Sequence, residues 1–218
     1  MAATSAETKP EGYYGAGRED LVAMLPRPLG RALDVGCGSG NVARGLRAAG
    51  ATEIAGVEVH PTFAAEAQDA LDELVVATIE DALAEHRLRG PFDTILCYDV
   101  LEHLVDPAPV LRDLLALAAP GGHLHVSVPN ARNFTLLRDL LLRGTFGYTD
   151  FGHRDYTHLR WFTRRDIVAT VQDAGWQVLQ TWPNTFRGKD RPVDRITRGH
   201  VREFIALQWT VLAQAPLR

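Results

Sequence analysis

Three glycines and one acid are the residues whose spacing most clearly predicts a binding site. Gly36, Gly38 and Gly40 alternate directly after a short apolar run, and Glu58 follows 22 positions after the first of them. Glycine allows positive φ and lets a ligand lie against bare backbone. An acid about 20 positions beyond such a turn can bind the two hydroxyls of a ribose. The pattern predicts a nucleoside site, although such turns also occur for tight packing alone.

A strand and a helix are expected on either side of this turn. Residues 32–37 are small or apolar except for Asp34, as in a short buried strand. Asn41 is expected to cap a helix that ends at Gly50. A buried carboxylate needs partners, and the amides of the glycine turn are the nearest candidates for Asp34.

The turn does not match the usual dinucleotide fingerprint. Its spacing is G-x-G-x-G, and Asn41 stands where G-x-G-x-x-G would have its third glycine. The segment DVGCGSG (residues 34–40) resembles the first motif of the class I S-adenosylmethionine-dependent methyltransferases. In that family the turn wraps the methionine end of the cofactor. The resemblance therefore implies cofactor contacts from five residues of this segment: Asp34, Gly36, Cys37, Gly38 and Gly40.

The resemblance extends over most of the chain. DVLEHL (residues 99–104) is similar to the family's fourth-strand motif, and APGGHLHVSVPN (119–130) to its following turn and fifth strand. Many relatives carry an aspartate near the adenine where this chain has Thr78. A Tyr-Tyr pair followed by Arg18 is similar to a segment that can close over the methionine carboxylate, unless the tyrosines only pack a helix onto the sheet. Further cofactor contacts are therefore implied for Tyr14, Arg18, Glu58, Val59, Thr78, Ile79, Glu80, Tyr98 and Asp99.

Alternating helical and extended segments predict an α/β fold. The expected strands are 53–59, 74–78, 92–98, 123–128 and 176–182, besides the first strand and a last one within 203–214. The expected helices are 19–25, 41–49, 61–71, 81–88, 106–118, 133–143 and 165–174. This order demands a parallel sheet with helices on both faces, and a last strand without a preceding crossover helix is expected to be antiparallel. We expect the family's Rossmann-like seven-stranded sheet, with Gly36, Glu58, Thr78, Asp99 and Pro129 at converging strand ends.

Length and composition indicate the number of domains, the kinds of partner and the location to expect. The chain has 218 residues, 46% of them hydrophobic, and a formal net charge of −4, which fits one α/β domain over residues 13–218 and no nucleic-acid partner. No stretch of 18 apolar residues occurs, so we expect no membrane partner. Residues 1–12 are expected to be a disordered tail rather than a secretion signal. Cys37 and Cys97 are expected to be reduced thiols of a cytoplasmic protein, which could form a homodimer.

Two segments fall outside the repeating pattern. Residues 144–162 are aromatic, glycine-punctuated and too long for a simple connection, so we expect a lid-like insertion. Residues 184–202 are polar and cation-rich and are expected to be a second insertion. His123 and His125 are predicted to share a strand face against solvent or a partner.

Candidate catalytic residues lie in the lid-like segment and after the fourth strand. They are His153, Asp155, His158 and His103, and histidine is the default base because its pKa lies near neutrality. The alternatives are structural: the lid histidines can pin that segment onto the sheet, and His103 can cap a helix or pack against a strand. A metal held by His153, Asp155 and His158 is the weaker alternative, and no zinc spacing occurs. We therefore expect no metal.

The sequence thus predicts an enzyme that moves a methyl group from S-adenosyl-L-methionine to an O or N atom of a small molecule. The acceptor would be a natural product, a sugar or an aromatic compound, and the product S-adenosyl-L-homocysteine. One alternative is an NAD-dependent oxidoreductase or epimerase, which Asn41 and the absence of a Tyr-x-x-x-Lys pair disfavour. Another is a non-catalytic cofactor-binding scaffold.

Overall fold

Seven strands form one sheet in the computed structural model, which describes residues 18–184 and 201–217. The strand order is β3-β2-β1-β4-β5-β7-β6. The strands are β1 (Arg31–Val35), β2 (Glu53–Glu58), β3 (Glu73–Val76), β4 (Phe92–Tyr98), β5 (Ala118–Pro129), β6 (Gln177–Asn184) and β7 (Gln208–Gln214). Pairs from β3 to β5 are parallel, whereas β7 is antiparallel to both β5 and β6. The predicted Rossmann-like sheet with an antiparallel last strand is confirmed.

The central strands end at the same level. Val35, the last residue of β1, pairs with Val57 on one side and Cys97 on the other. The chain runs outward from β1 to β3 and then returns to β4 on the opposite side of β1. A crevice is expected at the carboxyl ends of β1 and β4, because the connections diverge there.

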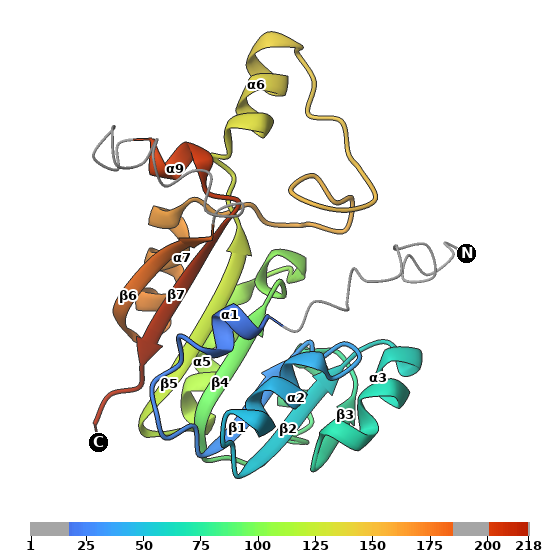
Figure 1. Cartoon of the computed structure of the whole chain (residues 1–218), viewed down its shortest axis with the longest axis vertical. Coiled ribbons are helices and arrows are strands. Elements are labelled where there is room, and N and C mark those ends of the chain that lie inside the picture. The colour runs from blue at the N-terminus through green and yellow to red at the C-terminus, as the bar shows by residue number, and fades with distance from the viewer. Residues whose placement is uncertain (1–17, 185–200, 218) are drawn as a thin grey trace.

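Helices cover both faces of this sheet (Figure 1). The helices of the described residues are α1 (Glu19–Val22), α2 (Asn41–Ala48), α3 (Pro61–Ala67), α4 (Ile79–Ala84), α5 (Pro107–Leu117), α6 (Phe134–Leu142), α7 (Arg164–Asp173) and α9 (Arg202–Ile205), with 3-10 turns at Gln68–Ala70 and Leu101–His103. Of these, α6 stands outside the sheet. Alternate residues of β1 separate the two cores. Ala32 packs in a cluster with Leu21 of α1 and Leu46 of α2, whereas Leu33 belongs to the cluster that contains α4, α5 and α7 residues.

Several predicted boundaries need correction. Asn41 is not the cap of α2, because Gly40 occupies that position with φ of 80° and the Asn41 amide donates to the Ser39 hydroxyl. A Cβ on Gly40 would lie 3.0 Å from Cα of Ala67, so glycine is also needed for helix packing. The helix predicted from residue 81 begins at Ile79 because Thr78 caps it. The predicted last strand is shorter at its start, where residues 202–205 form α9.

The prediction that His123 and His125 share a face against solvent or a partner is wrong for His125. Its side chain is fully buried, and Nδ1 lies 2.6 Å from the hydroxyl of Tyr98. The cause is β7, which pairs with β5 along this stretch and places Leu212 opposite His125. His123, nearer the start of β5, is half-buried.

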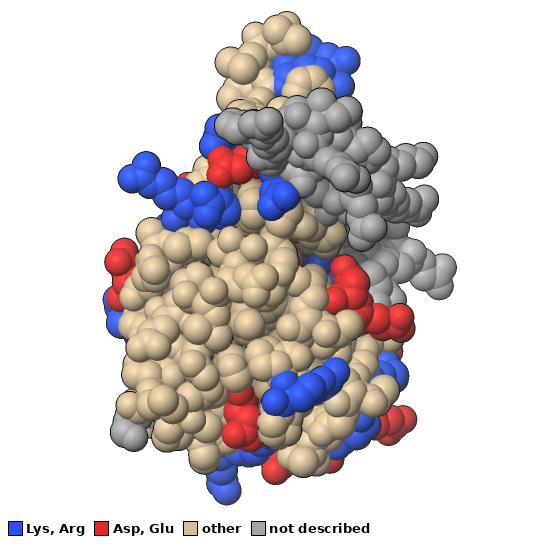
Figure 2. Space-filling view, turned by 60° about the vertical axis from the view of Figure 1, so that its left-hand side comes forward, with Lys and Arg blue, Asp and Glu red and all other residues tan. Residues whose placement is uncertain are grey.

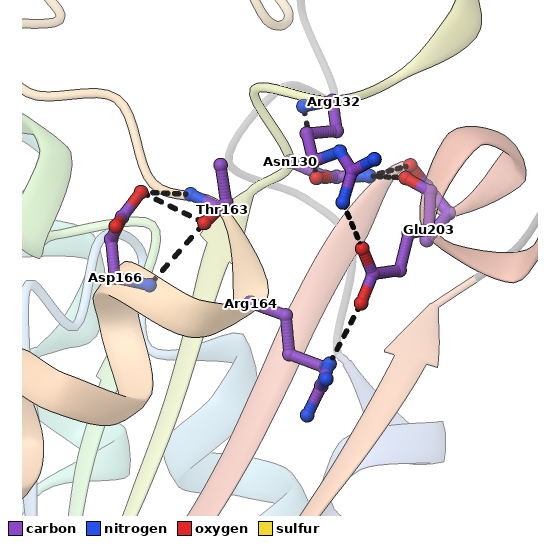
Figure 3. Close-up of polar contacts among 7 residues, drawn as sticks. Asn130, Arg132, Thr163, Arg164, Asp166 and Glu203 are labelled. Carbon is purple, nitrogen blue, oxygen red and sulfur yellow. Dashed lines mark hydrogen bonds and ion pairs between the residues drawn. The ribbon is translucent and has the colours of Figure 1, made fainter.

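A long excursion leaves the sheet after β5 and returns before α7. Its two ends meet where the amide of Ala131 donates to the carbonyl of Phe162, at 2.9 Å. Asn130 fixes this root by donating to the carbonyls of Glu203 and Ala206, at 2.7 and 2.8 Å. Figure 3 shows how Glu203 also bridges Arg132 and Arg164, which lie on either side of the root. The excursion therefore starts from a base held by hydrogen bonds and ion pairs.

The excursion contains α6 and then a segment without regular helix or strand from 143 to 163. The predicted lid of residues 144–162 falls within this segment. The predicted tail of residues 1–12, Tyr13, Tyr14 and most of the 184–202 insertion lie outside the described residues. Of the helices that the structure describes, none is long and apolar enough to cross a membrane.

Candidate functional site

A cavity of about 940 Å³ opens at the carboxyl ends of the parallel strands. All five strand-end residues expected to converge line it: Gly36, Glu58, Thr78, Asp99 and Pro129. They come from β1, β2, β3, β4 and β5 or the residues directly after them. The predicted position of the crevice thus matches the structure.

Glu58 is held in place by backbone amides on both oxygens. Oε2 accepts from the amide of Gly38 at 2.9 Å, and Oε1 accepts from the amide of His60 at 2.8 Å. The turn itself is tied to β2, because the amides of Gly36 and Cys37 both donate to the carbonyl of Val57. A carboxylate fixed in this way keeps lone pairs for hydroxyl donors without needing to reorganise.

Asp34 lies beneath the turn, but the turn amides do not bind it as expected. Its side chain is 2% exposed, and its Oδ2 has no hydrogen-bond partner among residues 18–184 and 201–217. Burial raises the pKa of Asp34 to about 7, and the nearby charge of Glu58 adds to the shift. The amide of Gly38 goes to Glu58 instead. Asp34 lines the cavity, and its Oδ2 is a buried oxygen without a partner in the described part of the chain.

Arg18, Asp99 and Gln208 form a polar network on the cavity wall. The guanidinium of Arg18 contacts both the carboxylate of Asp99 and the side-chain carbonyl of Gln208, the latter at 2.8 Å. The amide of Gln208 donates to Asp99, which adopts φ of 55° just after β4. Sequence reasoning missed Gln208, because it opens β7 without any motif. Only the antiparallel insertion of β7 beside β5 brings it here.

Two histidines meet at the cavity wall. His103 follows β4 in a 3-10 turn, and its ring lies edge-on to that of His158 with centroids 4.8 Å apart. Nδ1 of His103 lies 3.2 Å from the carbonyl of Thr157 and 3.1 Å from its hydroxyl. The carbonyl can only accept, and the hydroxyl already donates its proton to Asp155. These contacts assign the proton of neutral His103 to Nδ1 and leave Nε2 as the basic nitrogen.

Glu102 joins these histidines and was missed as a site residue. One ligand-type atom from each of Glu102, His103 and His158 lies within 4.8 Å of the other two. Glu102 is nearly fully buried, and its carbonyl accepts from the amides of Leu159 and Arg160. The signal was present in DVLEHL, where an acid directly precedes His103. Three ligand-type atoms at this spacing could hold a cation.

The other two candidate bases differ in position. His153 lines the cavity and donates from Nε2 to the carbonyl of Leu207 at 2.7 Å, while burial lowers its pKa. Asp155 is fully buried and does not line the cavity. Its Oδ1 accepts from the amide and hydroxyl of Thr157, at 2.9 and 2.7 Å. The prediction of Asp155 as a base therefore needs correction, because this carboxylate shapes the segment that carries His158.

The remaining predicted cofactor residues mostly line the same cavity. Gly40 does not, because it packs α2 against α3. Tyr14 lies outside the described residues. Both cysteines are free and buried, and burial raises the pKa of each thiol. Those that line the cavity are Arg18, Asp34, Gly36, Cys37, Gly38, Glu58, Val59, Thr78, Ile79, Glu80, Tyr98 and Asp99.

Comparison with known proteins gives one family. Residues 11–181 match the methyltransferase domain family. The chain is 30% identical over 199 residues to the ubiquinone biosynthesis O-methyltransferase of Xanthomonas axonopodis pv. citri (strain 306), which covers 84% of this chain and 81% of the relative. It is 29% identical over 186 residues to the enzyme of the same name from Xanthomonas campestris pv. campestris (strain B100), covering 78% and 75%.

Solved structures share the fold at lower identity. A putative methyltransferase of Haloferax volcanii, in complex with the Trm112 methyltransferase activator, matches with a TM-score of 0.67 at 17% identity, over 95% of this chain and 92% of that chain. An S-adenosylmethionine-dependent methyltransferase from Mesorhizobium loti matches with a TM-score of 0.62 at 19% identity, over 92% and 98%.

Proposed function

The chain belongs to the methyltransferase domain family, and we propose that it transfers a methyl group from S-adenosyl-L-methionine to an O or N atom of a small molecule. The observation that carries the proposal is the carboxylate of Glu58, fixed by two amides at the edge of a cavity floored by the glycine turn. The O-methyltransferase names of the two Xanthomonas relatives favour oxygen as the acceptor atom.

The residues present fit this cofactor. Glu58 offers two fixed oxygens to the ribose hydroxyls, and the bare turn at Gly36 and Gly38 leaves room for the chain beyond the ribose. The orphaned Oδ2 of Asp34 is a further acceptor under the turn. Arg18 is a forked donor suited to a carboxylate such as that of methionine. Thr78 and its two successors lie on the remaining wall, where an adenine ring would need contacts.

The bound cofactor supplies an electrophilic methyl group on a sulfonium. The chain itself must orient the methyl acceptor and provide a group that takes the proton of that acceptor. His103 carries its own proton on Nδ1 toward Thr157, so Nε2 is the basic atom. Neutral His153 carries its proton on the other nitrogen, Nε2, because Nε2 donates to the carbonyl of Leu207. His158 and Glu102 surround His103 and are in a position to stabilise its protonated form.

Four further expectations belong to the same proposal. Two free, buried thiols support a cytoplasmic enzyme. Neither the homodimer nor the absence of nucleic acid has a direct observation behind it, and both stay predictions. The segment of residues 144–162, which contributes Phe151, His153 and His158 to the cavity wall, supports the prediction of a cover for a small acceptor.

Methyl transfer can be tested with labelled cofactor. The full chain is incubated with S-adenosyl-L-methionine labelled on the methyl group and a panel of catechols, hydroxybenzoates, sugars and amines. We expect the label in at least one acceptor, with equimolar S-adenosyl-L-homocysteine. Tight binding of S-adenosyl-L-homocysteine without transfer to any member would instead favour the non-catalytic scaffold. Binding of NAD alone would favour the oxidoreductase.

A further inference from the structure

Three side chains from two distant parts of the chain are joined in series by hydrogen bonds. The hydroxyl of Thr157 lies 3.1 Å from Nδ1 of His103. On its other side, the same hydroxyl lies 2.7 Å from Oδ1 of Asp155. Thr157 and His103 both line the cavity, whereas Asp155 is buried behind them. The series therefore runs from a buried carboxylate to a ring at the cavity wall.

The direction of each hydrogen bond in this series follows from groups whose roles are fixed. The backbone amide of Thr157 can only donate, and it donates to Oδ1 of Asp155 at 2.9 Å. This oxygen is therefore an acceptor, and it also takes the single proton of the Thr157 hydroxyl. The hydroxyl oxygen then has only lone pairs to offer to His103, as has the Thr157 carbonyl. Nδ1 of His103 must donate, so the lone pair of the neutral ring is on Nε2.

The carboxylate at the start of the series is shielded from water. Figure 2 shows lysines, arginines and acids at the surface, where water solvates them, but Asp155 has an exposed fraction of 0%. A buried carboxylate depends on hydrogen-bond donors of the protein, and both the amide and the hydroxyl of Thr157 donate to it. Within such a site a carboxylate polarises the hydroxyl that it holds more strongly than it would in water.

Backbone bonds hold the two parts of the series in register. The amides of Leu159 and Arg160 donate to the carbonyl of Glu102, at 2.8 and 3.0 Å. In Figure 1, residues 144–162 belong to the coil that runs from α6 back to the sheet. These bonds keep Thr157 beside His103, although the segment has no regular helix or strand.

We propose that Thr157 and Asp155 are positioning residues, which hold His103 in the tautomer and orientation that let Nε2 take the proton of the methyl acceptor. In that step the O–H or N–H bond of the acceptor breaks and an N–H bond forms at Nε2. The proton on Nδ1 stays in place, and its bond to the polarised hydroxyl stabilises the positive ring. Asp155 thus acts through Thr157 and takes no proton itself. This catalytic consequence rests on the proposed function, but the tautomer of His103 does not.

The alternative is that the turn formed by Asp155 and Thr157 only folds the segment. That turn depends on the bond from the Thr157 amide to the Asp155 side chain, and Thr157→Val keeps the amide. Valine has nearly the shape of threonine but no hydroxyl. The variant therefore interrupts the series while leaving the turn, which separates the two interpretations.

Nitrogen-15 magnetic resonance of the full chain, labelled in histidine, reports the tautomer without cofactor or methyl acceptor. Spectra are recorded at about pH 8.5, where histidine is neutral, with a chelator present so that no cation occupies the ring. The signals lost in His103→Gln assign this residue. We expect wild-type His103 to be protonated on Nδ1 alone. Thr157→Val should show a mixture of both tautomers, because only the 3.2 Å carbonyl contact remains.

Turnover is then compared on an acceptor found with labelled cofactor. Thr157→Val and Asp155→Asn should each lower kcat roughly tenfold, while affinity for S-adenosyl-L-homocysteine changes less than about twofold. Thr157→Ser restores the hydroxyl and should keep at least roughly half of the wild-type kcat. Thr145→Val is the matched control, because Thr145 is exposed in the same segment and its hydroxyl accepts from the amide of Gly147. It should match the wild type in both measurements.

Three results would each overturn the proposal. One is a wild-type His103 that carries its proton on Nε2. Another is a Thr157→Val variant whose His103 signals equal those of the wild type. The third is a kcat of Thr157→Ser as low as that of Thr157→Val, which would show that side-chain shape matters rather than the hydroxyl. Failure of the proposed function would look different, since the wild type would show the expected tautomer but transfer no methyl group.

Discussion

The backbone amide of Gly38 donates a 2.9 Å hydrogen bond to Oε2 of Glu58, 20 residues further along the chain. This bond joins the turn after β1 to the end of β2, and the amide of His60 holds the other oxygen of the same carboxylate. The acid that the sequence marks for ribose binding is therefore also the residue that fixes the glycine turn. Binding and local structure depend on the same two oxygens.

The first prediction concerns Glu58→Gln. The amide nitrogen of glutamine would face a backbone N–H, and one fixed acceptor for a ribose hydroxyl would be lost. We expect affinity for S-adenosyl-L-homocysteine to fall by roughly 1–3 kcal/mol in calorimetry. The control is Glu66→Gln, an exposed acid on α3, which should bind like the wild type. Equal affinity of both variants would contradict the role given to Glu58.

The second prediction separates the histidines from cofactor binding. His103→Ala should lower kcat by roughly 10²–10⁴-fold, because it removes the basic nitrogen. His158→Ala should lower kcat less, because the His158 ring contacts His103 but is not itself the proton acceptor. Affinity for S-adenosyl-L-homocysteine should change less than about twofold in both. His86→Asn, an exposed residue with φ of 54° that asparagine tolerates, serves as the control. Unchanged kcat in both alanine variants would place the proton acceptor elsewhere.

The third prediction is a pH dependence of stability due to Asp34. Burial raises the pKa of this carboxyl to about 7 in the folded chain, above the value near 4 expected when unfolded. Its contribution to stability is therefore complete below about pH 4 and is lost as the pH rises through 7.

Asp34→Asn removes this titration. Compared with the variant, the wild type should lose up to about 4 kcal/mol in free energy of unfolding between pH 4 and 8. Denaturant titrations at several pH values measure the difference. A difference between the two proteins that stays constant over that range would show that Asp34 does not titrate as described.

The fourth prediction concerns the root of the excursion. Asn130→Ala leaves the carbonyl of Glu203 without this side-chain donor. The carbonyl of Ala206 loses one of two side-chain donors and keeps the amide of Asn133, at 3.1 Å. We expect unfolding free energy to fall by roughly 1–3 kcal/mol. The exposed residue Gln172 on α7 offers a control, since Gln172→Ala should be nearly neutral. If Asn130→Ala is equally neutral, the polar root shown in Figure 3 does not stabilise the excursion.

Local patterns were sufficient to predict the strands that carry the site. Residues 92–98 form β4 as expected, because an apolar run bounded by polar residues has few alternatives. The burial of His125 could not be predicted, because it depends on β7, which comes almost 90 residues later. Gln208 reaches the cavity for the same reason. Asp155 looked like a base by residue type, and only the local turn with Thr157 shows otherwise.

The exposure of one face of α6 could not be predicted from the sequence either. Its pattern of leucines resembles that of any amphipathic helix that packs on a core. Only the position of α6 outside the sheet leaves Leu141 and Leu142 in solvent.

Calorimetric titration of the wild-type chain tests the central claim most directly. With S-adenosyl-L-homocysteine in the syringe, the account predicts saturable binding of one molecule per chain, and no heat of binding with NAD under the same conditions. Absence of binding by S-adenosyl-L-homocysteine, or binding of NAD in its place, would contradict the account.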